Sequence, residues 1–157
     1  MIKRLLAVIG ILAIAWVPAS AQKAGNFGGG AILGSTNGAT IKYWMGKNQA
    51  IDAGLGAYVQ DSAFSFYADY LFHKSDVFDQ PKKGKLTGYA GPGLRIQDRR
   101  GTGEFGIRGP LGLNYLTSKQ THPVELFVEL APVILFNGRT AFDLDGMVGL
   151  RYYFFWK

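Results

Sequence analysis

The sequence predicts an all-β fold, an eight-stranded antiparallel up-and-down transmembrane β-barrel preceded by a cleaved signal peptide. Six segments alternate strictly, and in each of them one face is apolar while the other carries charge and glycine. Side chains alternate across a strand with period two, so each segment is a strand with one apolar face. An outer-membrane barrel turns that face outward, whereas a soluble barrel buries it. The first residues of the chain favour the membrane.

Residues 1–21 have the pattern of a secretory signal peptide. The basic pair Lys3-Arg4 precedes the apolar run Leu5–Val17, and Ala19-Ser20-Ala21 fits the small-residue cleavage pattern. The apolar run is too short for a comfortable transmembrane helix, which needs about 20 residues. We therefore expect export, a mature barrel domain over residues 22–157, and a location in the outer membrane of a Gram-negative bacterium.

Four strands are predicted in the first half of the mature chain. Phe27–Gly34 is glycine-rich and weakly patterned, and Ala39–Met45 sets isoleucine, tyrosine and methionine against threonine, lysine and tryptophan. Ala50–Val59 alternates aliphatic residues with aspartate and glycine, and Ala63–His73 alternates phenylalanine with serine, tyrosine and aspartate. Such period-two runs, bounded by turn residues, are typical of strands joined by hairpins.

Four more strands are predicted in the second half. Lys85–Gln97 and Glu104–Leu116 set leucine and isoleucine against arginine, threonine and asparagine. Glu125–Val133 has leucine and valine on one face and two glutamates on the other, and Asp143–Trp156 ends in alternating aromatic residues. Short turns between consecutive strands predict an antiparallel meander, and closure of that meander removes its free edges.

Two features fit this barrel less well. Pro92, Pro110 and Pro132 lie within predicted strands, where a missing N–H donor interrupts the ladder, so we expect bulges or strand ends there. The longest connection, Lys74–Gly84, would lie on the periplasmic side if both termini do, although periplasmic turns are usually the short ones.

The polar faces predict a narrow lumen that is filled by side chains. Eight strands enclose room for side chains rather than a wide pore. Glycines between long charged residues suit such a lumen, and opposite charges would pair there because an unpaired buried charge is costly. Nine residues are predicted to form this lumen charge network: Lys42, Asp52, Asp69, Arg95, Arg108, Glu125, Glu129, Asp145 and Arg151.

Composition excludes some classes of function. The formal charge of +6 falls to +4 when Lys3 and Arg4 leave with the signal, which is too mild to indicate nucleic-acid binding. The chain has no cysteine, so it forms neither a disulfide nor a thiolate metal site. Two basic clusters, Lys82-Lys83-Lys85 and Arg99-Arg100, fall in or beside predicted loops. They are either solvated loop residues or contacts for lipid phosphates at a membrane surface.

Several short blocks of sequence carry a resemblance. The blocks are Lys42-Tyr43-Trp44, Ala50-Ile51-Asp52, Ala68-Asp69-Tyr70-Leu71 with His73, Phe105-Gly106-Ile107-Arg108, Glu125-Leu126-Phe127 with Glu129 and Ala131-Pro132, and Gly149-Leu150-Arg151-Tyr152-Tyr153-Phe154. In this order they resemble a functionally uncharacterised family of small outer-membrane β-barrels from spirochaetes and other Gram-negative bacteria. The last block also looks like the C-terminal strand that the barrel-insertion machinery reads. The resemblance implies the barrel, its location and that transient partner, and it implies no chemistry.

We expect a structural or interaction role, with outer-membrane lipid and lipopolysaccharide as surroundings. Two alternatives stand beside it. His73-Lys74-Ser75 superficially resembles the His-x-Ser element of lipid A deacylases, with Asp76 and Asp79 as candidate third members of a lipid A-modifying site. A soluble periplasmic lipocalin-like barrel would instead turn the apolar face inward. No metalloprotease motif, phosphate loop or metal-ligand spacing is present, so we expect no catalytic residue, cofactor or metal.

Overall fold

A computed structural model describes residues 25–58, 63–99, 101–117, 123–136 and 140–154, so the predicted signal peptide lies outside the described residues. Within these ranges the chain forms ten strands and no helix, hence no helix long and apolar enough to cross a membrane. The strands are β1 (Phe27–Gly34), β2 (Thr36–Trp44), β3 (Gln49–Tyr58), β4 (Ala63–Lys74), β5 (Lys85–Ala90), β6 (Gly93–Arg99), β7 (Thr102–Arg108), β8 (Leu111–Leu116), β9 (Val124–Phe136) and β10 (Thr140–Phe154).

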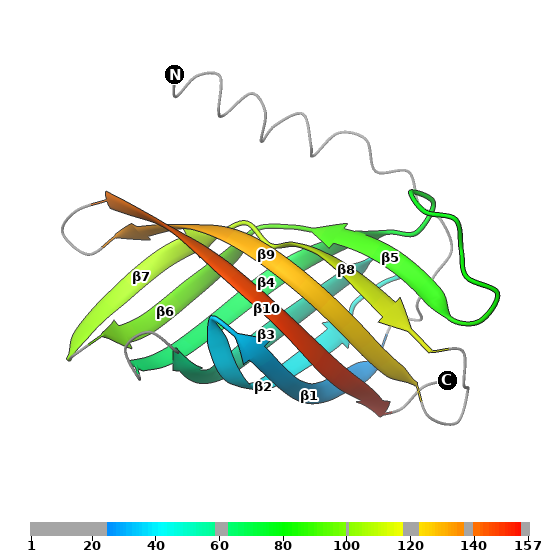
Figure 1. Ribbon diagram of the computed structural model, residues 1–157, viewed down its shortest axis with the longest axis horizontal. Coiled ribbons are helices and arrows are strands. Elements are labelled where there is room, and N and C mark those ends of the chain that lie inside the picture. Colours follow the sequence, from blue (N-terminus) through cyan, green and yellow to red (C-terminus); the bar gives the residue numbers. More distant parts are fainter. Residues whose placement is uncertain (1–24, 59–62, 100, 118–122, 137–139, 155–157) are drawn as a thin grey trace, which may run out of the picture.

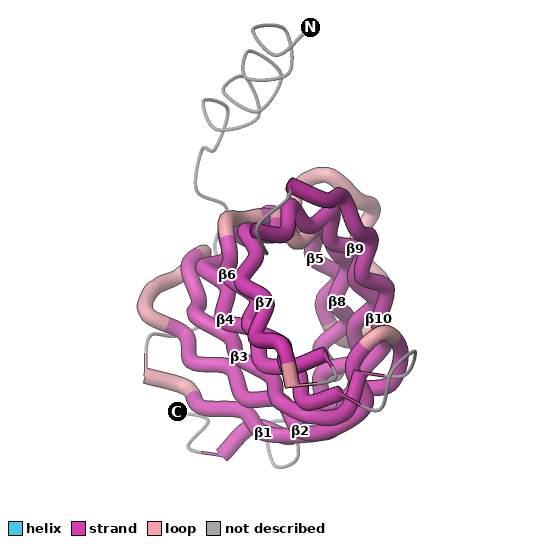
Figure 2. The backbone as a smooth tube through the Cα atoms, turned by 90° about the vertical axis from the view of Figure 1, so that its left-hand side faces the viewer, coloured by secondary structure: helices cyan, strands magenta, loops and turns pink. Residues whose placement is uncertain are grey.

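The strands close into an antiparallel barrel. Neighbours pair from β1 through β2 and β3 to β4, and β9 pairs with β10, which returns to β1. Between β4 and β9 the wall consists of β5 and β8 near one end and of β6 and β7 near the other. A closed ring therefore passes through eight strands (Figures 1 and 2). The predicted antiparallel all-β fold is confirmed, and each of the predicted strands Lys85–Gln97 and Glu104–Leu116 is split into two.

The prolines explain the splits. Pro92 separates β5 from β6 and Pro110 separates β7 from β8, as expected for residues without an N–H donor. Pro132 was expected to cause a bulge or strand end, and this was wrong, because β9 continues through it. Its carbonyl oxygen accepts the N–H of Gly109 at 3.0 Å, so the same edge of Pro132 faces the gap between β7 and β8. Two residues paired in this way normally exchange two bonds, so the missing N–H of Pro132 leaves this pair with one bond, while β9 stays paired with β10.

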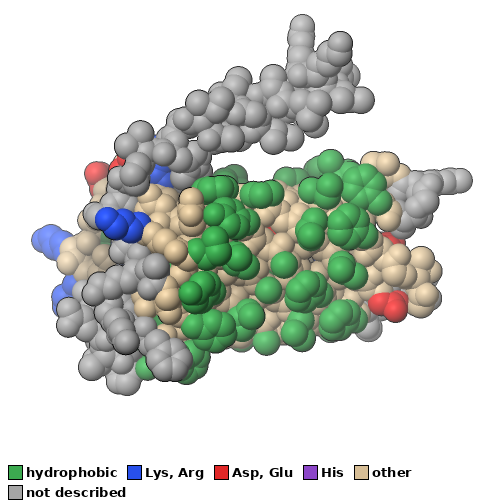
Figure 3. Space-filling view, turned by 180° about the vertical axis from the view of Figure 1, so that it is seen from behind, with side chains coloured by type: hydrophobic (Ala, Val, Ile, Leu, Met, Phe, Trp, Pro, Cys, Tyr) green, Lys and Arg blue, Asp and Glu red, His purple; other side chains and the backbone are tan. Residues whose placement is uncertain are grey.

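The apolar face of the barrel points outward. On β9, Leu126, Val128 and Leu130 are exposed, whereas Glu125 and Glu129 are buried. The same alternation runs through the other strands, so leucine, isoleucine, valine and phenylalanine side chains form a belt around the outside. Figure 3 shows the part of this belt that lies on one face. This arrangement is the reverse of the lipocalin-like alternative, which requires the apolar face inside.

The two ends of the barrel differ in their connections. We call the end where β1 begins and β10 finishes the terminal end (Figure 1). The turn between β2 and β3 and the longest connection, Ser75–Gly84, lie at this end. At the opposite end a single residue, Ser35, joins β1 to β2. The long connection therefore lies on the same side as the start of β1 and the end of β10.

Candidate functional site in the barrel interior

The structure places all nine residues of the predicted lumen charge network inside the barrel. None of them is more than 2 % exposed. They come from seven different strands, β2, β3, β4, β6, β7, β9 and β10, because each strand turns its polar face inward. Four are basic and five are acidic, and their ion pairs divide them into three groups along the lumen.

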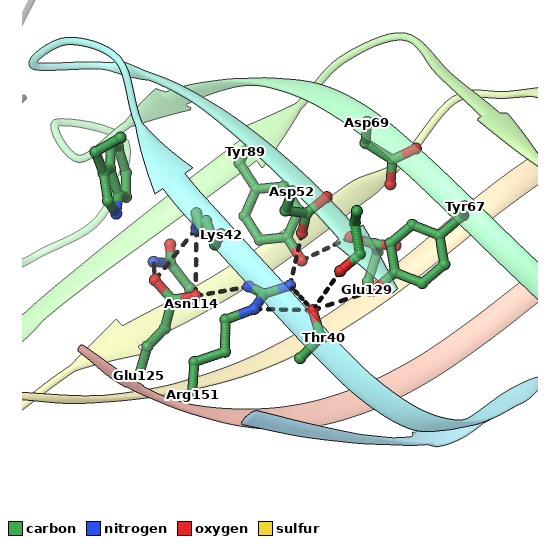
Figure 4. Close-up of polar contacts among 12 residues, drawn as sticks. Thr40, Lys42, Asp52, Tyr67, Asp69, Tyr89, Asn114, Glu125, Glu129 and Arg151 are labelled. Atoms are coloured by element: carbon green, nitrogen blue, oxygen red, sulfur yellow. Dashed lines mark hydrogen bonds and ion pairs between the residues drawn. The ribbon is translucent and has the colours of Figure 1, made fainter. Parts of the chain in front are cut away.

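Arg151 on β10 is the centre of the first group (Figure 4). Its guanidinium donates to Oδ2 of Asp52 at 2.6 Å and to Oε1 of Glu125 at 2.8 Å. Two further bonds, at 2.9 and 3.1 Å, go to the hydroxyl of Thr40. Lys42 approaches both oxygens of Glu125 at 3.2 Å. Two cations and two carboxylates thus neutralise one another in the middle of the lumen, which is the arrangement that offsets the cost of burying charge.

Glu125 also ties this group to an apolar layer at the terminal end. The amide of Asn114 donates to Glu125 at 2.8 Å, and the hydroxyl of Tyr153 donates to it at 2.9 Å. The indole N–H of Trp44 in turn donates to the Tyr153 hydroxyl at 3.0 Å. Trp44 and Tyr153 pack with Ala50 and Leu116 in a buried cluster, so the charged layer is closed off by packed rings on this side.

Arg108 on β7 organises the second group. It forms an ion pair with Glu129 and lies 3.5 Å from Asp69. The Tyr89 hydroxyl donates to Glu129 at 2.9 Å. One arginine therefore serves two carboxylates, and a tyrosine supplies an additional donor to one of them.

Arg95 and Asp145 form a third group, nearer the opposite end. Arg95 lies 2.5 Å from Asp145 and 2.7 Å from Asp143. Beside them the amide of Gln97 donates to Glu104. Asp143 and Glu104 belong to the same charged interior, although neither was among the nine predicted residues.

Interior glycines let these side chains meet across a strand. Among the described residues, several glycines lie between two inward residues, one on each neighbouring strand, that approach one another across the glycine. Because a glycine has no side chain, the two residues on either side can reach over it. Four such arrangements are Arg151–Gly30–Thr40, Arg108–Gly93–Asp69, Tyr89–Gly112–Glu129 and Tyr67–Gly54–Thr40.

Two of the arginines also stack on aromatic rings. The Arg108 guanidinium lies 4.3 Å from the ring centre of Tyr67, and that of Arg151 lies 3.9 Å from the ring centre of Phe127. The same two rings also cover glycines, Tyr67 over Gly54 and Phe127 over Gly149. A planar cation over a ring contributes cation–π attraction in addition to its ion pairs, so each arginine is fixed by charge and by packing together.

The His-x-Ser element does not assemble a catalytic pair. His73 is buried inside the barrel, with its ring centre 4.3 Å from that of Trp44 and 5.3 Å from that of Tyr89. Among the described residues neither ring nitrogen of His73 has a hydrogen-bond partner, so none bonds to the Ser75 hydroxyl. Asp76 pairs with Lys74 at 3.9 Å instead. A nucleophilic serine needs a bonded base, and this arrangement supplies none.

Neither a metal-binding cluster among the described residues nor a similar known protein points to a function. In the ranges that it describes, no three His, Cys, Asp or Glu side chains come together in a way that could hold a metal ion. No known protein family, curated protein or solved structure matches this chain. The residues and their geometry therefore carry the functional argument alone.

Proposed function

We propose that this chain is a small integral protein of the bacterial outer membrane with a structural or interaction role, and that its lumen is filled by charge rather than open as a wide pore. The observation that carries this proposal is the inverted arrangement of the two faces. Exposing so many large apolar side chains to water is unfavourable, and monomeric soluble proteins rarely show an apolar patch of this extent. Lipid removes that cost.

The dimensions of the apolar belt support a membrane span. From Leu126 to Phe136, β9 rises about 33 Å, which is about 25 Å along the barrel axis at a tilt of about 40°. That height matches the apolar band of outer-membrane barrels. Every outward residue over this stretch is exposed. The predicted signal peptide at residues 1–21 is consistent with export to that membrane.

Aromatic residues near both ends of the belt support the same proposal. At the terminal end, Tyr70 packs edge-on against Phe72 and Tyr152 against Phe154. At the opposite end, the rings of Phe105 and Phe136 stack with centres 6.3 Å apart. Outer-membrane barrels carry aromatic girdles at their two membrane interfaces, so these rings mark the limits of the proposed span. Lipopolysaccharide, phospholipid and, during assembly, the insertion machinery are its proposed partners.

Cell fractionation and gel migration test this proposal. We expect the protein in the outer-membrane fraction, and we expect unboiled samples to migrate differently from boiled samples on denaturing gels, because a folded barrel resists unfolding by detergent. Leu130→Arg should destabilise insertion by about 2–4 kcal/mol, the cost of a cation near the bilayer midplane. Gly103→Arg is the control, because the space around Gly103 is open. Recovery as a soluble periplasmic protein, or equal tolerance of both arginines, contradicts the proposal.

A further inference from the structure

We propose that the connection between β4 and β5, residues Ser75–Gly84, is a lipid-contact element that binds the phosphate headgroups of anionic phospholipids through Lys82 and Lys83. This inference rests on the proposed membrane location. It assigns a specific partner to a segment that the barrel itself does not require, since a far shorter turn joins β1 to β2 at the other end.

The connection is built into the barrel by one side chain. β5 extends beyond the end of β4, because the ladder between them covers only Gly88 to Ala90. The Gln80 side chain takes this place: its oxygen accepts the N–H of Leu86 at 3.1 Å, and its amide donates to the Leu86 carbonyl at 2.9 Å. The same amide donates to the Ser75 carbonyl at 2.6 Å. Gln80 thus caps a free strand edge and fixes the connection beside it.

This attachment places the connection on the outer side of the wall. Gly88 faces outward on β5, and a Cβ atom built on it would lie 3.3 Å from Cε2 of Phe78. Phe78 therefore packs against the outside of the barrel. The next residue toward the N-terminus, Val77, is 58 % exposed. An apolar side chain presented beside the rim of the apolar belt is in position to enter the headgroup region of a bilayer.

The basic part of the connection suits a phosphate surface: its two aspartates precede Gln80, and Asp76 is paired with Lys74, whereas its two lysines follow Gln80. Lys82 and Lys83 are exposed, and the Lys83 carbonyl accepts the Tyr115 hydroxyl at 2.8 Å, which fixes this stretch at the rim. In Figure 3 the visible Lys and Arg side chains lie at one end of the barrel, beyond the edge of the belt. Long lysine side chains keep their ammonium groups at the headgroup level while their methylene stems cover apolar surface. Anionic lipid attracts such basic segments at a membrane surface.

A fluorescent label on this connection tests the inference, because the chain has no cysteine of its own. Val77→Cys, labelled and folded into phosphatidylcholine vesicles, is quenched with spin-labelled phosphatidylglycerol or with spin-labelled phosphatidylcholine. The ratio of the two apparent binding constants measures headgroup preference. We expect a clear preference for phosphatidylglycerol that falls about fivefold for each lysine removed by Lys82→Gln and Lys83→Gln. Asp79→Asn removes a negative charge from the same connection, so it should raise the preference for phosphatidylglycerol.

The controls separate this inference from the membrane proposal. A label at Leu130→Cys, in the middle of the belt, should be quenched by both lipids equally. If neither lipid quenches the Leu130→Cys label, the membrane proposal itself is wrong. If that label is quenched but the label at Val77→Cys shows no preference, or keeps its preference without both lysines, only the lipid-contact inference is overturned. Loss of the preference for phosphatidylglycerol in excess inorganic phosphate would also overturn the lipid-contact inference, because it would show that the lysines bind free phosphate rather than a lipid headgroup.

Discussion

Replacing Arg151 with methionine should lower the free energy of unfolding by about 3–5 kcal/mol, the usual cost of leaving buried charge unpaired. Methionine preserves much of the volume but none of the donors. Glu125 keeps Lys42, whereas among the described residues Asp52 is hydrogen-bonded only through Oδ2, to Arg151. Urea unfolding of the refolded protein in vesicles, followed by tryptophan fluorescence, measures the change.

Two comparisons make this result specific to the buried network. Lys74→Met removes an ion pair with Asp76 at 3.9 Å that is partly exposed, and it should cost less than about 1 kcal/mol. In the Asp52→Asn background, Arg151→Met should cost clearly less than in the wild type, because the stranded charge is already gone. Equal costs for Arg151→Met and Lys74→Met would show that Arg151 is not the centre of a buried network.

Gly54→Ala should destabilise the barrel by about 1–3 kcal/mol, the cost of overfilling a packed interior. A Cβ atom at this position would lie 2.6 Å from Cζ of Tyr67, and the three nearest atoms all belong to that tyrosine. The ring is buried, and the Arg108 guanidinium packs against it, 4.3 Å from its centre. It therefore has little room to move away. The same unfolding assay measures the loss.

Gly103→Ala is the matched control for this substitution. Gly103 also lies in a strand, but a Cβ atom there would meet nothing within 4 Å. Alanine at this site should be neutral or slightly stabilising, since it restricts the unfolded chain. In a Tyr67→Ala background, Gly54→Ala should become equally harmless. A cost that persists in that background would mean that the ring over Gly54 is not what excludes a side chain.

The direction in which each side chain points could be predicted from the sequence, because successive side chains of a strand alternate between its two faces. On β9, Glu125 and Glu129 share a face with Ala131 and Val133, and a period of two assigns all four inward. The splits at Pro92 and Pro110 follow from the missing donor. The outcome at Pro132 could not be predicted, because it depends on a gap between two other strands that happens to lie opposite.

The pairing of the charges could not be predicted, because it depends on how strands distant in sequence are placed around the closed ring. Arg151 lies on β10 and Asp52 on β3, and the strands β1 and β2 stand between them in the wall. The two residues meet only because closure of the ring pairs β10 with β1. Thr40, Asn114, Tyr89 and Tyr153 were missed because only charged residues were selected from the inward faces. A usable signal was present in the inward glycines, since Gly30, Gly93 and Gly112 each lie between two residues that meet.

The central claim is that the outward apolar face lies in lipid. Labelling of the unmodified protein in vesicles by a carbene generated within the bilayer, with mass spectrometry of the products, tests this most directly. β9 contains its own control, because Phe127, Val133 and Leu135 are apolar but buried inside. We predict labels on Leu126, Val128, Leu130 and Ile134 and none on those three residues. Labels on the inward residues, or no label on the outward ones, would contradict the account.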